Sequence, residues 1–101
     1  MIIITGGARI KPDDMAEALA LGCEHSARSR AEPGCIAHNC HVDAEDPARI
    51  VFLELWADIA AVQTHFAVPK SSDFVRKLGA MAVARPDIHL YQASELPSPF
   101  G

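Results

Sequence analysis

The chain of 101 residues is poor in basic residues and has no long apolar run, and both absences exclude classes of protein. Nine Lys and Arg stand against thirteen Asp and Glu, for a net charge of −4. The basic residues are scattered, so no phosphate-binding footprint for nucleic acid is present. No apolar run approaches the roughly 18 residues that cross a bilayer, and residues 1–4 lack the basic flank of a signal peptide. We expect a cytoplasmic protein without nucleic-acid or membrane partners.

Cysteine is also scarce and does not form a framework. Cys23, Cys35 and Cys40 are an odd set without a Cys-x-x-Cys pair, which favours reduced thiols over disulfides. We expect Cys23 to pack as a small apolar residue on a helix.

Length and composition indicate one domain. Half of the residues are hydrophobic, a share typical of globular proteins, and a chain of this length supports a single core. We assign residues 1–94 to one domain and residues 95–101, which contain two prolines, to a C-terminal tail.

The first half of the chain reads as a strand, a helix and two paired strands. The β-branched run from Ile2 predicts a strand that continues to residue 10. Asp14 with Glu17 resembles a capping box at a helix start, and an apolar stripe recurs every four residues until the helix ends before Pro33. The stripe consists of Met15, Leu19, Cys23 and Ala27. Residues 35–42 and 50–56 read as antiparallel strands joined by a polar turn over residues 43–49.

The second half reads as two helices and a strand. Asp58 is a predicted N-cap, with Val62 and Phe66 on the inner side of a helix that ends near Pro69. Ser71 or Ser72 would cap the next helix, which carries three residues inward: Phe74, Leu78 and Met81. Residues 87–93 form the last predicted strand. The order predicts an α+β, ferredoxin-like βαββαβ fold with a four-stranded antiparallel sheet and helices on one face.

Alternation along the strands divides the residues of the sheet between its two faces. We assign Val51, Leu53 and Leu55 to the helix side. The opposite set would then form an apolar patch on the open face, covered by the sheet of a second subunit in a dimeric α/β barrel. That set consists of Ile50, Phe52, Glu54 and Trp56.

In the preceding strand, Ile36, Cys40 and Val42 are assigned to the helices. Asn39 and His41 would then share a cavity on the open face with Glu54 and Trp56. A register slip of one residue would reverse this assignment.

Several short motifs resemble the antibiotic biosynthesis monooxygenase family, which includes quinol monooxygenases and belongs to the dimeric α/β barrel superfamily. They are Glu32-Pro33-Gly34-Cys35, the turn with Glu45-Asp46-Pro47 and Arg49, Glu54-Leu55-Trp56, His65, Pro69 and Phe74. The resemblance covers nearly the whole chain. It implies a homodimer with a pocket between sheet and helices. It also implies that a quinol, anthrone or related phenol is oxygenated by dioxygen without a cofactor.

Such a reaction needs a base and polar partners in a dry aromatic cavity. We take His65 as the candidate base and His41 as its reserve. Asn39, Trp56 and Tyr91 are candidate catalytic partners, as hydrogen-bonding amide, stacking ring and hydroxyl. Substrate binding is assigned to His41, Glu54, Phe52 and Phe66.

Structural roles compete with these assignments. His65 could instead bridge helix and sheet, and Trp56 could be a core residue. For Glu54, a buried ion pair with an arginine is the alternative that we favour over catalysis, with Arg49, Arg76 or Arg85 as the partner.

The run His38-Asn39-Cys40-His41 contains zinc-ligand types, but the spacing argues against a metal site. His41 points away from His38 and Cys40, Cys35 lies on the wrong face, and no second His/Cys pair follows. We expect no metal and no cofactor.

Two other functions remain open. A haem-degrading relative is disfavoured because Thr5 and Gly6 stand where that branch has Asn, and the helix after Pro69 carries no His. A noncatalytic dimer that binds or senses a small aromatic ligand is the alternative from another class.

Overall fold

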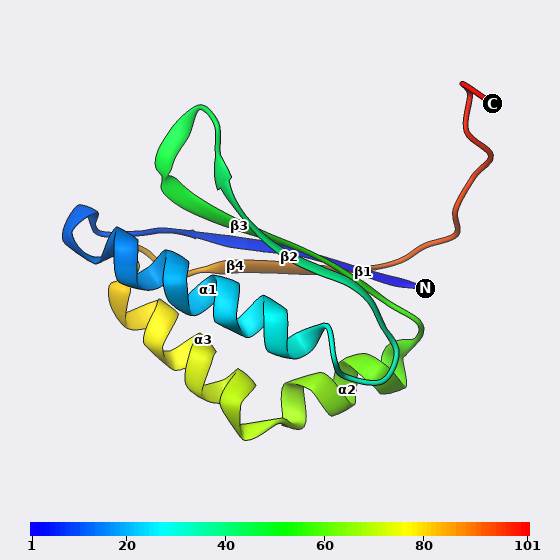
Figure 1. Cartoon of the computed structure of the whole chain (residues 1–101), viewed down its shortest axis with the longest axis horizontal. Coiled ribbons are helices and arrows are strands. Elements are labelled where there is room, and N and C mark those ends of the chain that lie inside the picture. Colours follow the sequence, from blue (N-terminus) through cyan, green and yellow to red (C-terminus); the bar gives the residue numbers. More distant parts are fainter.

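The computed structural model, which describes residues 1–101, has four strands, three α-helices and one short 3₁₀ turn (Figure 1). The elements are β1 (Ile2–Arg9), η1 (Pro12–Asp14), α1 (Met15–Ser29), β2 (Cys35–Asp43), β3 (Asp46–Trp56), α2 (Ile59–Ala67), α3 (Pro69–Met81) and β4 (Asp87–Gln92). The strands form one sheet in the order β2-β3-β1-β4, and all neighbours are antiparallel. The ferredoxin-like α+β prediction is confirmed.

All three α-helices lie on one side of the sheet, and the other face is left open (Figure 1). The β2–β3 hairpin curls up on the side of the sheet opposite the helices, and the chain after β4 leads away from the body. None of the helices combines the length and apolarity that crossing a membrane requires.

The hairpin turn is tighter than its sequence indicates. Only Ala44 and Glu45 separate β2 from β3, whereas the sequence predicts a turn over residues 43–49. The Asp43 carboxylate accepts a hydrogen bond from the backbone N–H of Glu45 at 2.8 Å. This local bond closes the turn early and lets β3 begin at Asp46.

Helix α1 follows the predicted stripe only in part: Met15 and Leu19 pack against the apolar core, but the two later positions do not. Its buried residues are Ala18, Gly22, His25, Ser26 and Ser29. Cys23 and Ala27 are exposed, because positions four apart drift by about 40° per step around a helix of 3.6 residues per turn. The predicted capping box is also wrong, since the Asp14 side chain makes no capping hydrogen bond.

Gly22 lets α1 approach the sheet closely. A Cβ atom at this position would lie 2.8 Å from Cys40 Sγ and 3.0 Å from a ring carbon of Phe52. The small residues of the α1 stripe therefore set the distance between helix and sheet.

The α2 and α3 boundaries follow their caps. Asp58 accepts a hydrogen bond from the backbone N–H of Ala61 at 2.9 Å, which confirms the predicted N-cap. Helix α3 begins at Pro69, as proline favours a first helical turn, so Ser71 and Ser72 lie inside the helix and do not cap it. The inward placement of Phe74, Leu78 and Met81 is confirmed.

The face assignment of β3 is reversed relative to the prediction. Ile50 and Trp56 are fully buried against the helices, whereas Leu53 is 42% exposed on the open face. Pairing with β1 sets this orientation: Glu54 and Trp56 lie opposite Ile4 and Ile2, which are core residues. The set that the sequence places at a dimer interface is thus the inner face of the sheet.

The β2 register separates the residues that the sequence places in one cavity. Asn39 pairs with Leu53 and His41 with Val51, so both lie on the open face, away from Glu54 and Trp56. The shared-cavity prediction is therefore wrong.

A bulge after Cys35 helps to fix that register. Ile36 next to the bulge and Val42 near the hairpin are exposed, contrary to the prediction that they pack on the helices.

Two apolar clusters form the core. The larger surrounds Phe52, Phe74 and Leu78, and the smaller surrounds Ile4, Trp56 and Val62. Buried polar side chains accompany them: His25, His38, Glu54 and His65. Along β3, Glu54 stands between Phe52 of one cluster and Trp56 of the other, so a polar layer divides the core.

Candidate active site between the helices and the sheet

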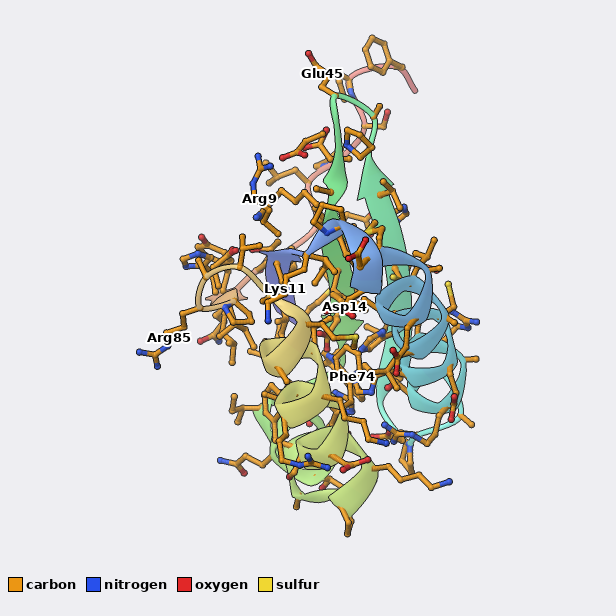
Figure 2. The ribbon with its side chains drawn as sticks, turned by 90° about the vertical axis from the view of Figure 1, so that its left-hand side faces the viewer. Arg9, Lys11, Asp14, Glu45, Phe74 and Arg85 are labelled. Carbon is orange, nitrogen blue, oxygen red and sulfur yellow. The ribbon has the colours of Figure 1, made fainter.

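A cavity of about 380 Å³ opens between α3, β1 and β4. Figure 2 shows Phe74 between α1 and α3, and Arg85 at the outer edge of the α3–β4 connection. Six residues with polar side chains line this cavity among mainly apolar surface, namely His25, Glu54, His65, Ser71, Arg85 and Asp87. Cavities with a few placed polar groups are typical of small-molecule sites.

The cavity collects only part of the predicted site. His65, Glu54, Phe52 and Phe66 line it. Trp56 is fully buried and packs against His65, with ring centroids 4.6 Å apart. Asn39, His41 and Tyr91 do not line it; Tyr91 pairs with Ile3 on the open face and is 55% exposed.

His65 is held between two carboxylates. Its Nδ1 lies 2.9 Å from Glu32 Oε1, and its Nε2 lies 3.9 Å from Glu54 Oε1. A carboxylate accepts, so Nδ1 carries the hydrogen and a neutral ring keeps its lone pair on Nε2. Glu32 also pairs with Arg28 at 3.4 Å, one helical turn earlier in the chain.

Glu54 has no arginine partner, so the predicted ion pair with Arg49, Arg76 or Arg85 is wrong. The Trp56 indole N–H donates to Glu54 Oε1 at 2.9 Å. Burial works to raise the pKa of Glu54, but His38, Trp56 and His65 outweigh it and hold the pKa below its usual value.

His38 lies opposite Glu54 and is completely buried. Its Nδ1 is 2.9 Å from Ser26 Oγ. Its Nε2 is 3.3 Å from Glu54 Oε1, close enough for charge pairing, yet the ring N–H direction does not meet hydrogen-bond geometry. We therefore treat this contact as electrostatic and not as a directed hydrogen bond.

His25 is a site residue that the sequence reasoning missed. Its ring stacks on Phe74 with centroids 4.0 Å apart, and Arg28 Nη2 lies 2.8 Å from its Nδ1. Burial lowers the pKa of His25 to about 3, with further lowering by His38, His65 and Arg28. Arginine only donates, so the neutral ring accepts at Nδ1 and carries its hydrogen on Nε2.

The sequence held one signal for His25. Ala18, Gly22, His25 and Ser29 recur at spacings of four, three and four, which is a helical stripe as regular as the apolar one. Together with His38 and His65, His25 offers a ring nitrogen to a buried group in which these atoms lie within 4.8 Å of one another.

Comparison with known proteins places the chain in a family. Residues 1–77 match the family model described as antibiotic biosynthesis monooxygenase. A crystal structure described as an antibiotic biosynthesis monooxygenase is 30% identical, with a TM-score of 0.86 over 94% of this chain and all of the other. A putative antibiotic biosynthesis monooxygenase from Deinococcus radiodurans is 25% identical, with a TM-score of 0.93 over both full chains.

Among curated relatives, the uncharacterized protein sll1783 of Synechocystis is 32% identical over 94 residues, or 93% of this chain. The match spans 64% of that relative's length. On the match over residues 1–77 and these likenesses, the chain belongs to the antibiotic biosynthesis monooxygenase family.

Proposed function

We propose that this protein is a cytoplasmic, homodimeric monooxygenase that oxidises an electron-rich quinol, anthrone or related phenol with dioxygen, without a cofactor. Residues 1–94 would form the catalytic domain. The pairing of His65 with Glu32 at the wall of the cavity carries the proposal.

The Glu32 carboxylate orients His65 as a base. Because Nδ1–H donates to Glu32, the Nε2 lone pair is available to take a substrate proton. The resulting imidazolium would stand between Glu32 and Glu54, whose negative charges stabilise it. His25 supplies a complementary group, a neutral ring that donates from Nε2 to a substrate oxygen.

The substrate supplies the electrons. Deprotonation makes an anthrone or hydroquinone a better one-electron donor to dioxygen, and the two radicals then combine to form a C–O bond. For an anthrone, the methylene loses two hydrogens and gains one oxygen atom, and the second oxygen atom leaves as water. All four electrons that reduce dioxygen come from the substrate.

The aromatic cavity suits such a substrate. Phe52, Phe66 and Phe74 line it and would contact a planar ring system. Trp56, which we predicted to stack on the substrate, is proposed instead to position His65 and Glu54 from behind. The proposed site leaves out Asn39, His41 and Tyr91, because these residues lie on the open face of the sheet, away from the cavity.

The open face supports the homodimer. In the single chain, Leu53 is 42% and Tyr91 55% exposed, and Val51 and Leu55 flank Leu53 on β3. Apolar residues of this size on a sheet face without helices mark an interface. A second copy would cover them.

Oxygen uptake by metal-free protein on a panel of hydroquinones, naphthohydroquinones and anthrones tests the function. We expect His65→Gln to lower kcat about 10²- to 10⁴-fold, the usual contribution of a general base. His41→Gln, an exposed histidine on the other face, is the matched control and should retain activity. Equal activity in both variants would remove His65 from the mechanism.

The same measurement distinguishes a monooxygenase from the noncatalytic alternative. A panel member that binds tightly without uptake above autoxidation would indicate a binding or regulatory dimer. That alternative is favoured by the mainly apolar wall, which can hold a ring without chemistry. Haem is not part of the proposal, since α3 carries no histidine.

A further inference from the structure

His38 carries an unusual buried atom. The residue is 0% exposed, and Nε2 is the buried side-chain nitrogen or oxygen that finds no hydrogen-bond partner. Buried polar atoms without partners cost stability, and each needs an explanation. No side chain or backbone group offers Nε2 a well-aligned acceptor, yet Glu54 Oε1 lies only 3.3 Å away.

Glu54 Oε1 is also 3.9 Å from Nε2 of His65. Two imidazole nitrogens and one carboxylate oxygen thus gather at the junction of β2, β3 and α2. From these contacts we propose that His38, His65 and Glu54 form a binding site for a divalent first-row transition metal ion. This donor set, two histidines and one carboxylate, suits ions such as Zn²⁺ or Fe²⁺.

The distances are compatible with binding after small side-chain movements. Ligand atoms about 2.1 Å from a tetrahedral ion lie about 3.4 Å from one another. The separations of 3.3 and 3.9 Å from Glu54 bracket that value. The His38 and His65 rings meet edge to face with centroids 5.6 Å apart, and each has a ring nitrogen within 4.8 Å of one of the other's.

The supporting contacts are already in place. His38 Nδ1 is 2.9 Å from Ser26 Oγ, and His65 Nδ1 is 2.9 Å from Glu32. Trp56 donates to Glu54 at 2.9 Å. Metal-binding histidines commonly use their second nitrogen in this way, which fixes the tautomer and leaves Nε2 free for the ion.

His25 is placed beside this site and does not ligate the ion. Arg28 donates to its Nδ1 at 2.8 Å, so its Nε2 carries a hydrogen. It would donate to water or another ligand in a remaining coordination position. Since Glu54, His65 and His25 all line the cavity, such a position would face it.

The metal proposal does not depend on the proposed function. An ion would engage His65 Nε2, the same lone pair that the metal-free reaction needs. Metal-bound and metal-free protein would therefore be alternative states, and the ion would inhibit the cofactor-free reaction.

Calorimetric titration of chelator-treated full-length protein with Zn²⁺ tests the site, with Co²⁺ visible absorption as an independent report of ligand geometry. We expect one ion per chain with a Kd of about 10 µM or lower. His38→Gln and Glu54→Gln should each weaken binding at least about 100-fold. Ser26→Ala, which keeps every ligand, should weaken it about 10-fold.

Three controls keep the result specific. His25→Gln should change the Kd less than about threefold. His41→Gln and His89→Gln replace exposed histidines and should not change it. Circular dichroism checks that each variant is folded. Binding that survives His38→Gln, or is lost with His41→Gln, would assign the ion to the surface and overturn the proposal, as would no binding by wild type.

The outcomes for the two proposals are separable. Metal-free oxygen uptake without specific metal binding would refute the metal site and leave the oxygenase. Specific binding without metal-free uptake would support the site and refute the cofactor-free function.

Discussion

The two faces of the sheet are almost equally apolar in sequence but differ in chemistry. On β3, the helix-facing set holds Phe52, Glu54 and Trp56, and the open set holds Val51 and Leu53. The helix side buries three histidines and a carboxylate beside a cavity. The open side carries its polar groups, including Asn39 and His41, toward solvent or a partner.

This difference shows that the helix-facing side of the sheet carries the free-energy cost of burying ionisable groups. Burying ionisable groups costs free energy unless partners compensate, and here Ser26, Glu32 and Trp56 are those partners. Such buried titratable clusters at a cavity indicate function more than stability. The open face shows no such cluster and is suited to association.

The largest contrast should appear when an aromatic residue is removed from each face. Trp56→Ala should lower the free energy of unfolding by about 3–5 kcal/mol, because it leaves a large cavity and removes the donor to Glu54. Tyr91→Ala should cost less than about 1 kcal/mol at high dilution, as expected for an exposed site. Urea unfolding measures both, and similar losses would contradict the assignment of faces.

A charge introduced on the open face should affect association and not the buried site on the helix side. Leu53→Glu should raise the dissociation constant of the proposed dimer at least about 100-fold, or about 2.7 kcal/mol, because it would bury an unpaired charge in an apolar interface. Val83→Glu, at an apolar position that is 51% exposed outside β3, is the control. Sedimentation equilibrium decides: a dimer that tolerates Leu53→Glu uses another surface.

A smaller effect should follow when only the support of the base is changed. Glu32→Gln should lower kcat for the proposed quinol or anthrone oxidation by about 10- to 100-fold, less than loss of the proposed base His65, and should shift the pH profile of kcat. The pH profile distinguishes a positioning role from general damage to the fold. An unchanged profile together with reduced stability would make Glu32 purely structural.

Acid stability should show the smallest effect when it is compared per pH unit. Folded His25 has a pKa near 3, against an ordinary value of 6.5, so the unfolded chain binds more protons between these pH values. The free energy of unfolding of metal-free protein should therefore fall as pH decreases from about 6.5, by at most about 1.4 kcal/mol per pH unit for this proton. Above pH 6.5 the contribution is fully present.

His25→Gln should remove this part of the slope, and His41→Gln should keep it. Both variants retain Glu54. Because its pKa is lowered in the folded protein, Glu54 also contributes a decrease in the free energy of unfolding as the pH falls through that pKa. Equal slopes in denaturation series from pH 4 to 8 would show that His25 titrates normally.

Much of the fold could be predicted because its signals are local. Asp58 caps α2 through a contact three residues away, and Phe74, Leu78 and Met81 recur at helical spacing. The family motifs likewise lie in short segments. The candidate site was only partly predictable: His65, Glu54, Phe52 and Phe66 reach the cavity, whereas Asn39, His41 and Tyr91 do not.

The metal site shows the limit of local sequence signals, because the spacing of ligand types in the sequence argued against it. Spacing in the sequence offered His38 no partner ligand, because its neighbours lie far along the chain: Glu54 on β3 and His65 on α2. Only the packing of these elements brings the three side chains together.

The sequence by itself determined the order of elements and their strong local caps, because propensity, capping and periodicity act over a few residues. It also determined that alternate residues of β3 face opposite ways. Which way they face was decided by the tertiary structure, through pairing with β1, the β2 bulge and the close approach of α1 at Gly22. Alternation divides the residues between two faces but does not indicate which face is buried. Only those long-range contacts could therefore assign the histidines and Glu54 to one buried site.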